Sequence, residues 1–319
     1  MWAYLIRRLG HVVFVVAVMA VLIFLITQAM PGNVAYSIAG HFASPEQVAA
    51  VEQRLGLHDP LWTQFWRWAG GALRGDMGDS LVMGRPVGPL ISEALGHSAQ
   101  LAVAALALTA LGGITLGVVA AIWHGRWPDR AVLGLSWLSI SLPQFLIAIV
   151  LVLVVAGTLG WLPATGYAPL SAGIGAWLSH LVMPVCTLVL GLLAHVAMLQ
   201  RSSMLEVLSA PYVRAARAKG LKERTVIFRH ALRNALIPTV TVLALDFGIL
   251  MGGIVVVETI FSYPGLGRLL IFAVEQKDLP VLQAGVLAVT VIYALANLAA
   301  DIVYAVLDPR IRYGNLRSA

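Results

Sequence analysis

The sequence predicts an all-α integral membrane protein with six transmembrane helices, and three observations support that prediction. Of the 319 residues, 60% are hydrophobic and only 11% are charged, whereas about a quarter of an ordinary soluble domain is charged. Six apolar runs approach or exceed the roughly 20 helical residues that cross a bilayer. Basic residues are also unevenly divided between the two sets of alternating segments that join these runs, as is typical of inserted chains.

Each apolar run is expected to be helical, because lipid offers the backbone no hydrogen-bond partner and a helix satisfies its own groups. The first run follows Arg7 and Arg8, as in a secretory signal. It continues to about Met30 without a small-x-small cleavage site, so we expect it to remain as a spanning helix. The expected spans are 11–30, 99–122, 131–157, 181–199, 236–258 and 282–306.

The distribution of Lys and Arg predicts that both termini are cytoplasmic. With the N-terminus inside, 15 of the 21 basic residues fall in cytoplasmic segments, eight of them between Arg201 and Arg233. Enrichment on the cytoplasmic side is the general rule for membrane proteins. Insertion therefore accounts for most of the net charge of +6, and no nucleic-acid-binding motif accompanies it.

The first external segment, 31–97, is too long for a turn and carries helix signals. Ser44 is followed by Pro45 and by Gln47, the pattern of a capping box at a helix start. Further on, aromatic and apolar residues recur at helical spacing and predict a face at the membrane interface. That face comprises Trp62, Phe65, Trp66 and Ala69.

These boundaries divide the chain into four parts. They are an N-terminal transmembrane helix at 1–30, an external cap at 31–97, a five-helix core at 98–306 with a cytoplasmic loop at 200–235, and a cytoplasmic tail at 307–319.

No catalytic pattern is present in the sequence. It contains no phosphate-binding loop, no His-Glu-x-x-His zinc pattern and no Gly-x-Ser-x-Gly elbow. The single cysteine, Cys186, excludes an internal disulfide framework. His97, His180 and His195 are not spaced as metal ligands, and polar packing is the expected role of each. The sequence therefore predicts a chain that is not an enzyme and holds no cofactor or metal.

Asp246 and Glu258 are candidates for a polar path through the membrane. A carboxylate at mid-membrane costs about 3 kcal/mol on insertion scales, so it is expected to face a partner or water. Asp246 lies just before Gly248 and Gly252, a small-xxx-small pair that permits close helix approach. Structural pairing is the alternative role for Asp246.

The cytoplasmic loop from 201 to 236 is the most informative segment. Its first part is rich in Ala, Arg and Lys and favours a helix, which Gly220 is expected to end. The following run to Asn234 predicts a second amphipathic helix. On composition alone, the alternative is an ordinary basic loop that serves insertion.

The order of Ala215-Ala216, Gly220 and Pro238 resembles the coupling loop of permease subunits of ABC importers. Arg214 replaces the usual Glu, and the interval from Gly220 to Pro238 is long; both departures are usual in the dipeptide, oligopeptide and nickel branch. The resemblance covers essentially the whole chain. Within this branch, the chain is similar to the first of the two permeases in such a complex. Further matching stretches are 75–80 with 85–87, 159–167, 201–206, 258–268 and 308–312.

The resemblance implies the six-helix type I importer permease fold and multi-pass insertion in a bacterial cytoplasmic membrane. It implies import of di- or oligopeptides, with a second permease, two ATP-binding subunits that hold ATP and Mg, and an external solute-binding protein as partners. Coupling to the ATPase is expected at Tyr212, Ala215, Ala216, Lys219, Gly220 and Leu221, and contact with the binding protein at Tyr263, Pro264, Gly265 and Gly267.

Three alternatives stay open. Within the same architecture, the cargo is a nickel or other metal chelate or a glutathione-like compound. A second alternative is an ion-coupled secondary transporter, and the intramembrane residues Asp246 and Asp301 support it. An intramembrane enzyme has candidates among Ser139, Ser141, His180 and His195, which show no recognisable spacing.

Overall fold

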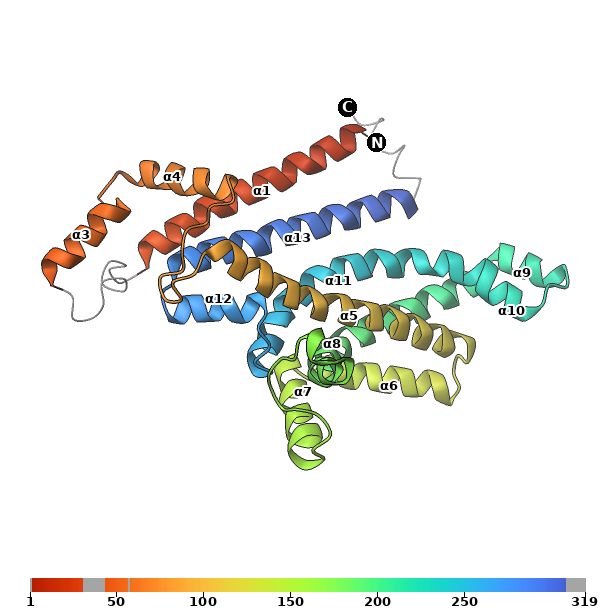
Figure 1. The fold of residues 1–319 in the computed structure, drawn as a ribbon. Coiled ribbons are helices and arrows are strands. Elements are labelled where there is room, and N and C mark those ends of the chain that lie inside the picture. Colours follow the sequence, from red (N-terminus) through yellow and green to blue (C-terminus); the bar gives the residue numbers. More distant parts are fainter. Residues whose placement is uncertain (1, 31–43, 57, 308–319) are drawn as a thin grey trace. The chain divides into compact units, whose positions relative to one another are not determined.

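The computed structural model describes residues 2–30, 44–56 and 58–307, and these residues are organised in helices (Figure 1). The only extended pairing among them is an isolated antiparallel bridge between Asp79 and Pro86. The matching stretch 308–312 lies outside the described residues. The chain divides into two compact units, one of residues 1–98 with 264–295 and the other of 99–263 with 296–319.

The first unit has its core where the start of α5 meets the helices after residue 264. Val87, Leu90 and Ile91 pack there with Leu266 and Val281. Apolar burial of this kind contributes about 25 cal/mol per Å². The unit contains α1 (Trp2–Ala29), α3 (Pro45–Leu55), α4 (Leu61–Leu73), the first turns of α5 (Val87–Ile122), α12 (Leu266–Glu275) and most of α13 (Leu279–Leu307).

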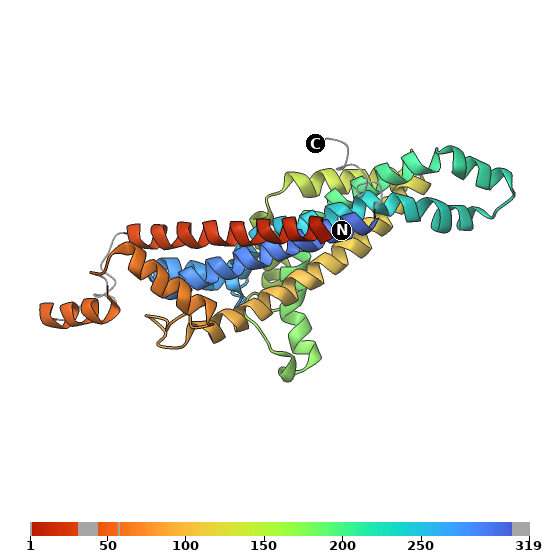
Figure 2. The same ribbon diagram turned by 90° about the horizontal axis from the view of Figure 1, so that it is seen from above.

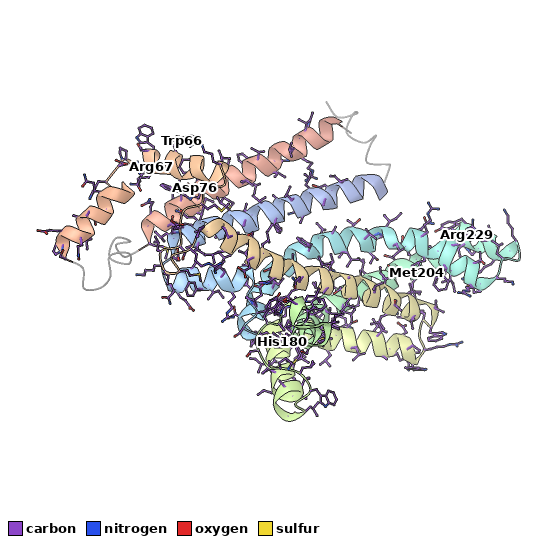
Figure 3. The ribbon with its side chains drawn as sticks, in the orientation of Figure 1. Trp66, Arg67, Asp76, His180, Met204 and Arg229 are labelled. Carbon is purple, nitrogen blue, oxygen red and sulfur yellow. The ribbon has the colours of Figure 1, made fainter. Side chains whose placement is uncertain are left out.

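The helices predicted between the first two apolar runs are present as α3 and α4. Ser44 caps α3, accepting a hydrogen bond from the Gln47 backbone while the Gln47 side chain accepts one from the Ser44 N–H. In α4, the Phe65 ring packs edge to face on Phe24 of α1 at 5.4 Å. Trp62 and Trp66 stay exposed, and Figure 3 labels Trp66. The predicted aromatic face is therefore divided between a contact with α1 and an outer surface.

The second unit is built on α8 and α11, which pack along each other and against α5. Leu101, Met183, Leu188 and Leu250 are among its buried core residues. The unit contains the rest of α5, α6 (Trp127–Ser141), α7 (Gln144–Leu151), the π-helix η1 (Val152–Thr158), the 3₁₀-helix η2 (Leu170–Ala172), α8 (Ile174–Leu208), α9 (Pro211–Ala218), α10 (Glu223–Thr225), the π-helix η3 (Val226–Ala231) and α11 (Leu232–Ile260).

The described residues contain four helices long and apolar enough to cross a membrane, in α1, α5, α8 and α13, or five when the bent pair described next is one span. The predicted fifth span, 236–258, lies within the 29-residue α11. Several helices are longer than their predicted spans: α5 begins at Val87, and α8 runs from Ile174 to Leu208.

The third predicted span, 131–157, is not one straight helix. The chain bends by 101° between α6 and the following helical segment. Pro143 has no N–H to donate and restricts the residue before it, so Leu142 adopts an extended conformation with φ −95° and ψ 124°. The break is therefore local in origin.

Candidate functional site

The helix α9 is a short amphipathic helix that ends just before Gly220, as the sequence predicts. Pro211 occupies the first helical position, and Gly220 follows the helix with φ 75°, a conformation that L side chains rarely adopt. Val213 and Ala216 are buried against Val226. Figure 2 shows α9 and α10 as a hairpin beyond the ends of α8 and α11.

Two side-chain contacts close this hairpin. Arg217 donates to Glu223, with Nη2 to Oε1 at 2.7 Å, and the Arg217 guanidinium lowers the pKa of the Glu223 carboxyl below its ordinary value. Asn234 Nδ2 donates to the Tyr212 hydroxyl at 2.8 Å. The predicted second amphipathic helix forms as α10 and η3, and it continues into α11 without a break.

Most of the predicted coupling residues lie on the outside of this hairpin. Ala216 is buried and supports the hairpin from within. The other five predicted residues are exposed: Tyr212, Ala215, Lys219, Gly220 and Leu221.

Asp246 is buried in the interface between α8 and α11, with 1% of its surface exposed. Its Oδ1 lies 3.4 Å from Nδ1 of His195, and its Oδ2 has no hydrogen-bond partner among the described residues. Elsewhere along the same pair of helices, Thr239 donates to Gln200 at 2.6 Å, and the Gln200 amide nitrogen also lacks a described partner. The α8–α11 interface therefore contains a polar strip with unused hydrogen-bonding capacity.

The other predicted path residues lie further along α11. Glu258 is fully buried, and its carbonyl accepts the Tyr263 N–H at 2.8 Å. Gly248 and Gly252 lie in α11, but what packs around them is outside the described part of the chain.

Tyr263 is 1% exposed and belongs to the core of the second unit. Its ring lies edge to face on Tyr167 at a centroid distance of 5.3 Å, and the Gly166 N–H donates to the Phe261 carbonyl at 2.8 Å. Tyr263 therefore shapes the end of this unit from within and is not a surface group of this chain.

In the first unit, Pro264 and Gly265 line a cavity of about 330 Å³. The Pro264 carbonyl lies 3.0 Å from His97 Nδ1, and the Leu266 N–H donates to Ser98 Oγ at 2.8 Å, so this wall is fixed to α5. Gly267 is buried. The cavity is lined further by Arg85, Glu93, His97 and Arg268 with apolar neighbours.

The turn that carries Met83 and Arg85 also lines this cavity, and Asp278 holds that turn in place. Asp278 is fully buried and accepts hydrogen bonds from Ser80 Oγ at 2.5 Å and from the Leu81 and Val82 N–H groups at 3.2 and 3.3 Å. Hydrogen bonds therefore fix two of the segments that line the cavity, beside side chains of α5 and α12.

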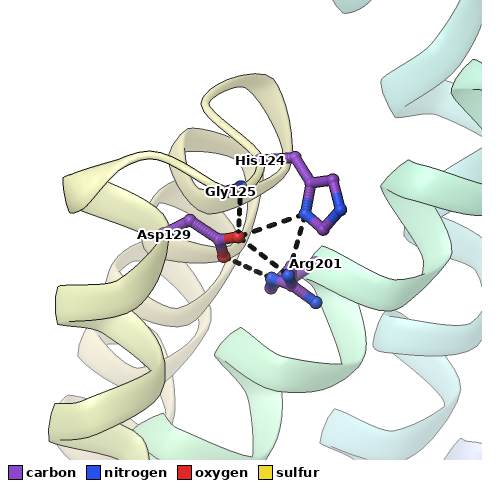
Figure 4. Close-up of polar contacts among 4 residues, drawn as sticks. All are labelled: His124, Gly125, Asp129 and Arg201. Atoms are coloured by element: carbon purple, nitrogen blue, oxygen red, sulfur yellow. Dashed lines mark hydrogen bonds and ion pairs between the residues drawn. The ribbon is translucent and has the colours of Figure 1, made fainter.

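A fourth cluster, at the turn between α5 and α6, was missed by the sequence analysis (Figure 4). The Asp129 side chain is 3% exposed; Arg201 donates to it from Nε to Oδ1 at 2.5 Å and from Nη2 to Oδ2 at 2.8 Å. The Gly125 N–H donates to Oδ2 at 2.8 Å, and His124 Nδ1 lies 3.1 Å from the same oxygen. The only signal in the sequence was an acidic residue just after a proline at a helix start, which is ordinary for a helix N-terminus.

Long apolar helices, a projecting amphipathic hairpin and a polar interior strip are together typical of a membrane transport subunit. Residues 113–313 match the family described as binding-protein-dependent transport system inner membrane component, and residues 1–98 match the N-terminal component of such systems. The chain belongs to this family. It is a permease component of a binding-protein-dependent transport system in the inner membrane, and the resemblance stated from the sequence is confirmed.

Individual relatives align with the chain over nearly its full length. It is 39% identical over 313 residues to a probable peptide ABC transporter permease of Sinorhizobium fredii, covering 98% of this chain and 100% of the relative. It is 41% identical over 310 residues to a glutathione transport system permease of Salmonella paratyphi A, and 40% to the one of Escherichia coli K12, covering 97% of this chain and 99% of each.

Proposed function

We propose that this chain is one of two permease subunits of an ATP-driven importer of di- and oligopeptides. The cargo is supported by the relatives, one named for peptide transport and others for glutathione, which is itself a small peptide. A glutathione-like compound is the second candidate on the same grounds. The proposal includes six membrane crossings with both termini in the cytoplasm, and the four-part division at residues 30, 97 and 306.

The observation that carries the proposal is the closed hairpin of α9 and α10. Its buried side is satisfied within the chain, whereas Tyr212, Ala215, Lys219 and Leu221 face outward. A small exposed helix with a rigid base is suited to dock in a groove of another protein. We assign these residues, with Gly220, to contact an ATP-binding subunit, which would hold ATP and Mg and hydrolyse the ATP. Ala216 would act indirectly, by supporting the helix from within.

The solute path is proposed along α11, at Asp246, Gly248, Gly252 and Glu258. Its support is the unused Oδ2 of Asp246 in the buried α8–α11 interface, because buried polar groups are generally hydrogen-bonded. ATP-driven movement of the hairpin would shift the bundle between two states that expose this strip to opposite sides.

The external binding protein is proposed to contact the cavity bounded by Pro264 and Gly265. Its two arginines and one glutamate make the lining net basic, so an acidic side chain of the binding protein is the complementary group. Tyr263 and Gly267 are both buried, so each would act by fixing the shape of the segment that carries it.

Substitution at Gly220 tests the coupling assignment. Gly220→Val forces a β-branched residue into the left-handed region, at a cost of about 1–3 kcal/mol, and alters the end of α9. Gly160→Val is the matched control, because Gly160 has φ 62° and likewise has no neighbouring atom within 4 Å.

In the reconstituted complex, Gly220→Val is expected to lower solute-stimulated ATPase and uptake by about tenfold or more, equivalent to about 1.4 kcal/mol. Gly160→Val should remain within about twofold. Equal behaviour of the two variants would remove the coupling assignment. Uptake that persists without ATP but follows an ion gradient would instead support a secondary transporter.

A further inference from the structure

The Asp129–Arg201 cluster joins segments of the second unit that are far apart in sequence. Asp129 is in the first turn of α6, whereas Arg201 is 72 residues later on α8. The guanidinium meets both carboxylate oxygens, a paired geometry that fixes orientation as well as charge. A salt bridge with this burial is not a flexible surface pair.

The carboxylate also organises the turn before α6. Gly125 has φ 77°, and its N–H donates to Asp129 Oδ2. The Arg126 N–H donates to the Trp123 carbonyl at 3.0 Å, closing the same turn. Arg201 therefore holds not only Asp129 but the whole connection between α5 and α6.

Close backbone packing reinforces the junction beside this ion pair. A Cβ placed on Gly117 of α5 would lie 2.6 Å from the Ala197 carbonyl oxygen and 2.9 Å from the backbone nitrogen of Arg201. Ala120 of α5, Val132 of α6 and Ala197 of α8 form a small buried cluster at the same place. Because packed interiors deform little, α5, α6 and α8 are expected to move together here.

The same stretch of α8 leads directly to the coupling hairpin. From Arg201 the helix continues unbroken to Leu208, and α9 begins at Pro211. Val207 and Leu208 pack against the buried face of the hairpin at Val213 and Val226. The hairpin is thus joined to Arg201 by about two continuous turns of α8.

We infer that the Arg201–Asp129 ion pair is the joint through which movement of the coupling hairpin is passed to α5 and α6. Both are positioning residues that do not touch the solute. The inference rests on the proposed function of α9 as the ATPase contact. It gives a role to Arg201, the first residue of the matching stretch 201–206.

His124 adds a constraint to this joint. Its Nδ1 lies 3.0 Å from Arg201 Nη2 and 3.1 Å from Asp129 Oδ2. A single ring nitrogen either accepts from the guanidinium or donates to the carboxylate, and it cannot do both. His124 is therefore an accessory group, and the Arg201–Asp129 pair is the part to test.

Asp129→Asn is the informative change, because the amide keeps an acceptor oxygen for Gly125 and removes the charge that holds Arg201. Arg201→Lys keeps the charge and loses the paired geometry. Arg130→Gln is the matched control, since Arg130 is exposed and adjacent to Asp129. All three are compared in the reconstituted complex by solute taken up per ATP hydrolysed.

The expected result is a fall of about tenfold in uptake per ATP for Asp129→Asn. A smaller fall is expected for Arg201→Lys, with Arg130→Gln close to the unmodified protein. Uptake per ATP for Asp129→Asn that matches Arg130→Gln would overturn the inference. Loss of assembly in both Asp129→Asn and Arg201→Lys would also overturn it, in favour of a folding role.

Distances between spin labels test directly whether the α5–α6 turn and the base of the hairpin keep a fixed separation. Arg126→Cys and Ser209→Cys are placed in a Cys186→Ser background, which removes the single native thiol. The label distance should be narrow and equal in nucleotide-free and ATP-bound states, and broad when Asp129→Asn is added. A label distance that is already broad in the protein with the native Asp129 would contradict the inference. Absence of solute-stimulated ATPase in the unmodified complex would instead defeat the proposed function itself.

Discussion

Two buried carboxylates in the second unit, Asp129 and Asp246, differ in how completely they are hydrogen-bonded. Asp129 accepts hydrogen bonds from the Arg201 guanidinium and the Gly125 backbone. Asp246 is as deeply buried, but it meets only His195, at 3.4 Å, and leaves one oxygen without a described partner. One carboxylate is saturated and the other is not.

This difference in hydrogen bonding suits Asp129 to a fixed junction between helices and Asp246 to a site that can accept a further donor. A buried charge is tolerated when it is paired and fully hydrogen-bonded, and such a group has one arrangement. An incompletely bonded carboxylate retains capacity for a further donor, such as a solute, water or a group that arrives in another conformation. The sequence gives both residues the same chemistry, so their neighbours create the distinction.

Removing Arg201 should have the largest effect. Arg201→Ala leaves the Asp129 charge buried without its main partner, a loss of about 3–5 kcal/mol in unfolding free energy. The double variant Asp129→Asn with Arg201→Gln should recover much of that loss. Denaturant unfolding of the purified chain measures both, and a loss no greater than that of His195→Ala would break the comparison.

Gly117→Ala should come next, because a methyl group would be forced against the α8 backbone beside Arg201. Overpacking of this kind costs about 1–3 kcal/mol. Gly134→Ala on α6 is the control, since its added Cβ meets no atom within 4 Å. Thermal unfolding should show a lower midpoint for the first variant only, and equal midpoints would mean that the α5–α8 contact is loose.

Asp246→Asn should change stability little, by about 1 kcal/mol or less, because it removes a buried charge that is poorly paired. Its effect should be on selectivity. Uptake of cationic peptides should fall several-fold, by about 1 kcal/mol, relative to neutral ones. Competition between labelled peptides of different charge measures this ratio, and an unchanged ratio would remove Asp246 from the path.

The Arg217–Glu223 pair should give the smallest effect, because it is exposed to solvent. Arg217 lowers the pKa of Glu223 from its ordinary 4.5, so the pair stabilises the folded chain above that pH. The contribution is lost as the pH falls through the lowered pKa of the folded state. Comparing unfolding of the native chain and Arg217→Gln between about pH 3 and 6 should show two curves that converge on the acid side. A gap that widens on acidification would contradict the assigned sign.

Local sequence signals predicted much of the helical organisation. Ser44 and Gln47 gave the start of α3, and Gly220 gave the end of α9, because capping depends on a few adjacent residues. The break at Pro143 was missed, although the signal was present. The apolar run continues through the proline, and hydropathy does not register the missing N–H.

The contacts of the candidate site could not be derived in the same way. Asp246 was recognised as unusual from its place in an apolar span, but its pairing with His195 joins residues on different helices. Arg201 and Asp129 are separated by 72 residues, and periodicity within one segment carries no information about another. The helix packing that joins them is a property of the fold.

The bend at Pro143 has a geometric consequence for the bilayer. The arms on either side, Trp127–Ser141 and Gln144–Thr158, contain 15 residues each and are about 22 Å long. With 101° between them, their combined reach is greatest, about 28 Å, when each is tilted by half that angle; this approaches the roughly 30 Å hydrocarbon core. If the pair is one span, it would cross as a chevron with its apex near mid-depth and displaced sideways; a re-entrant loop is the alternative for a pair bent this sharply.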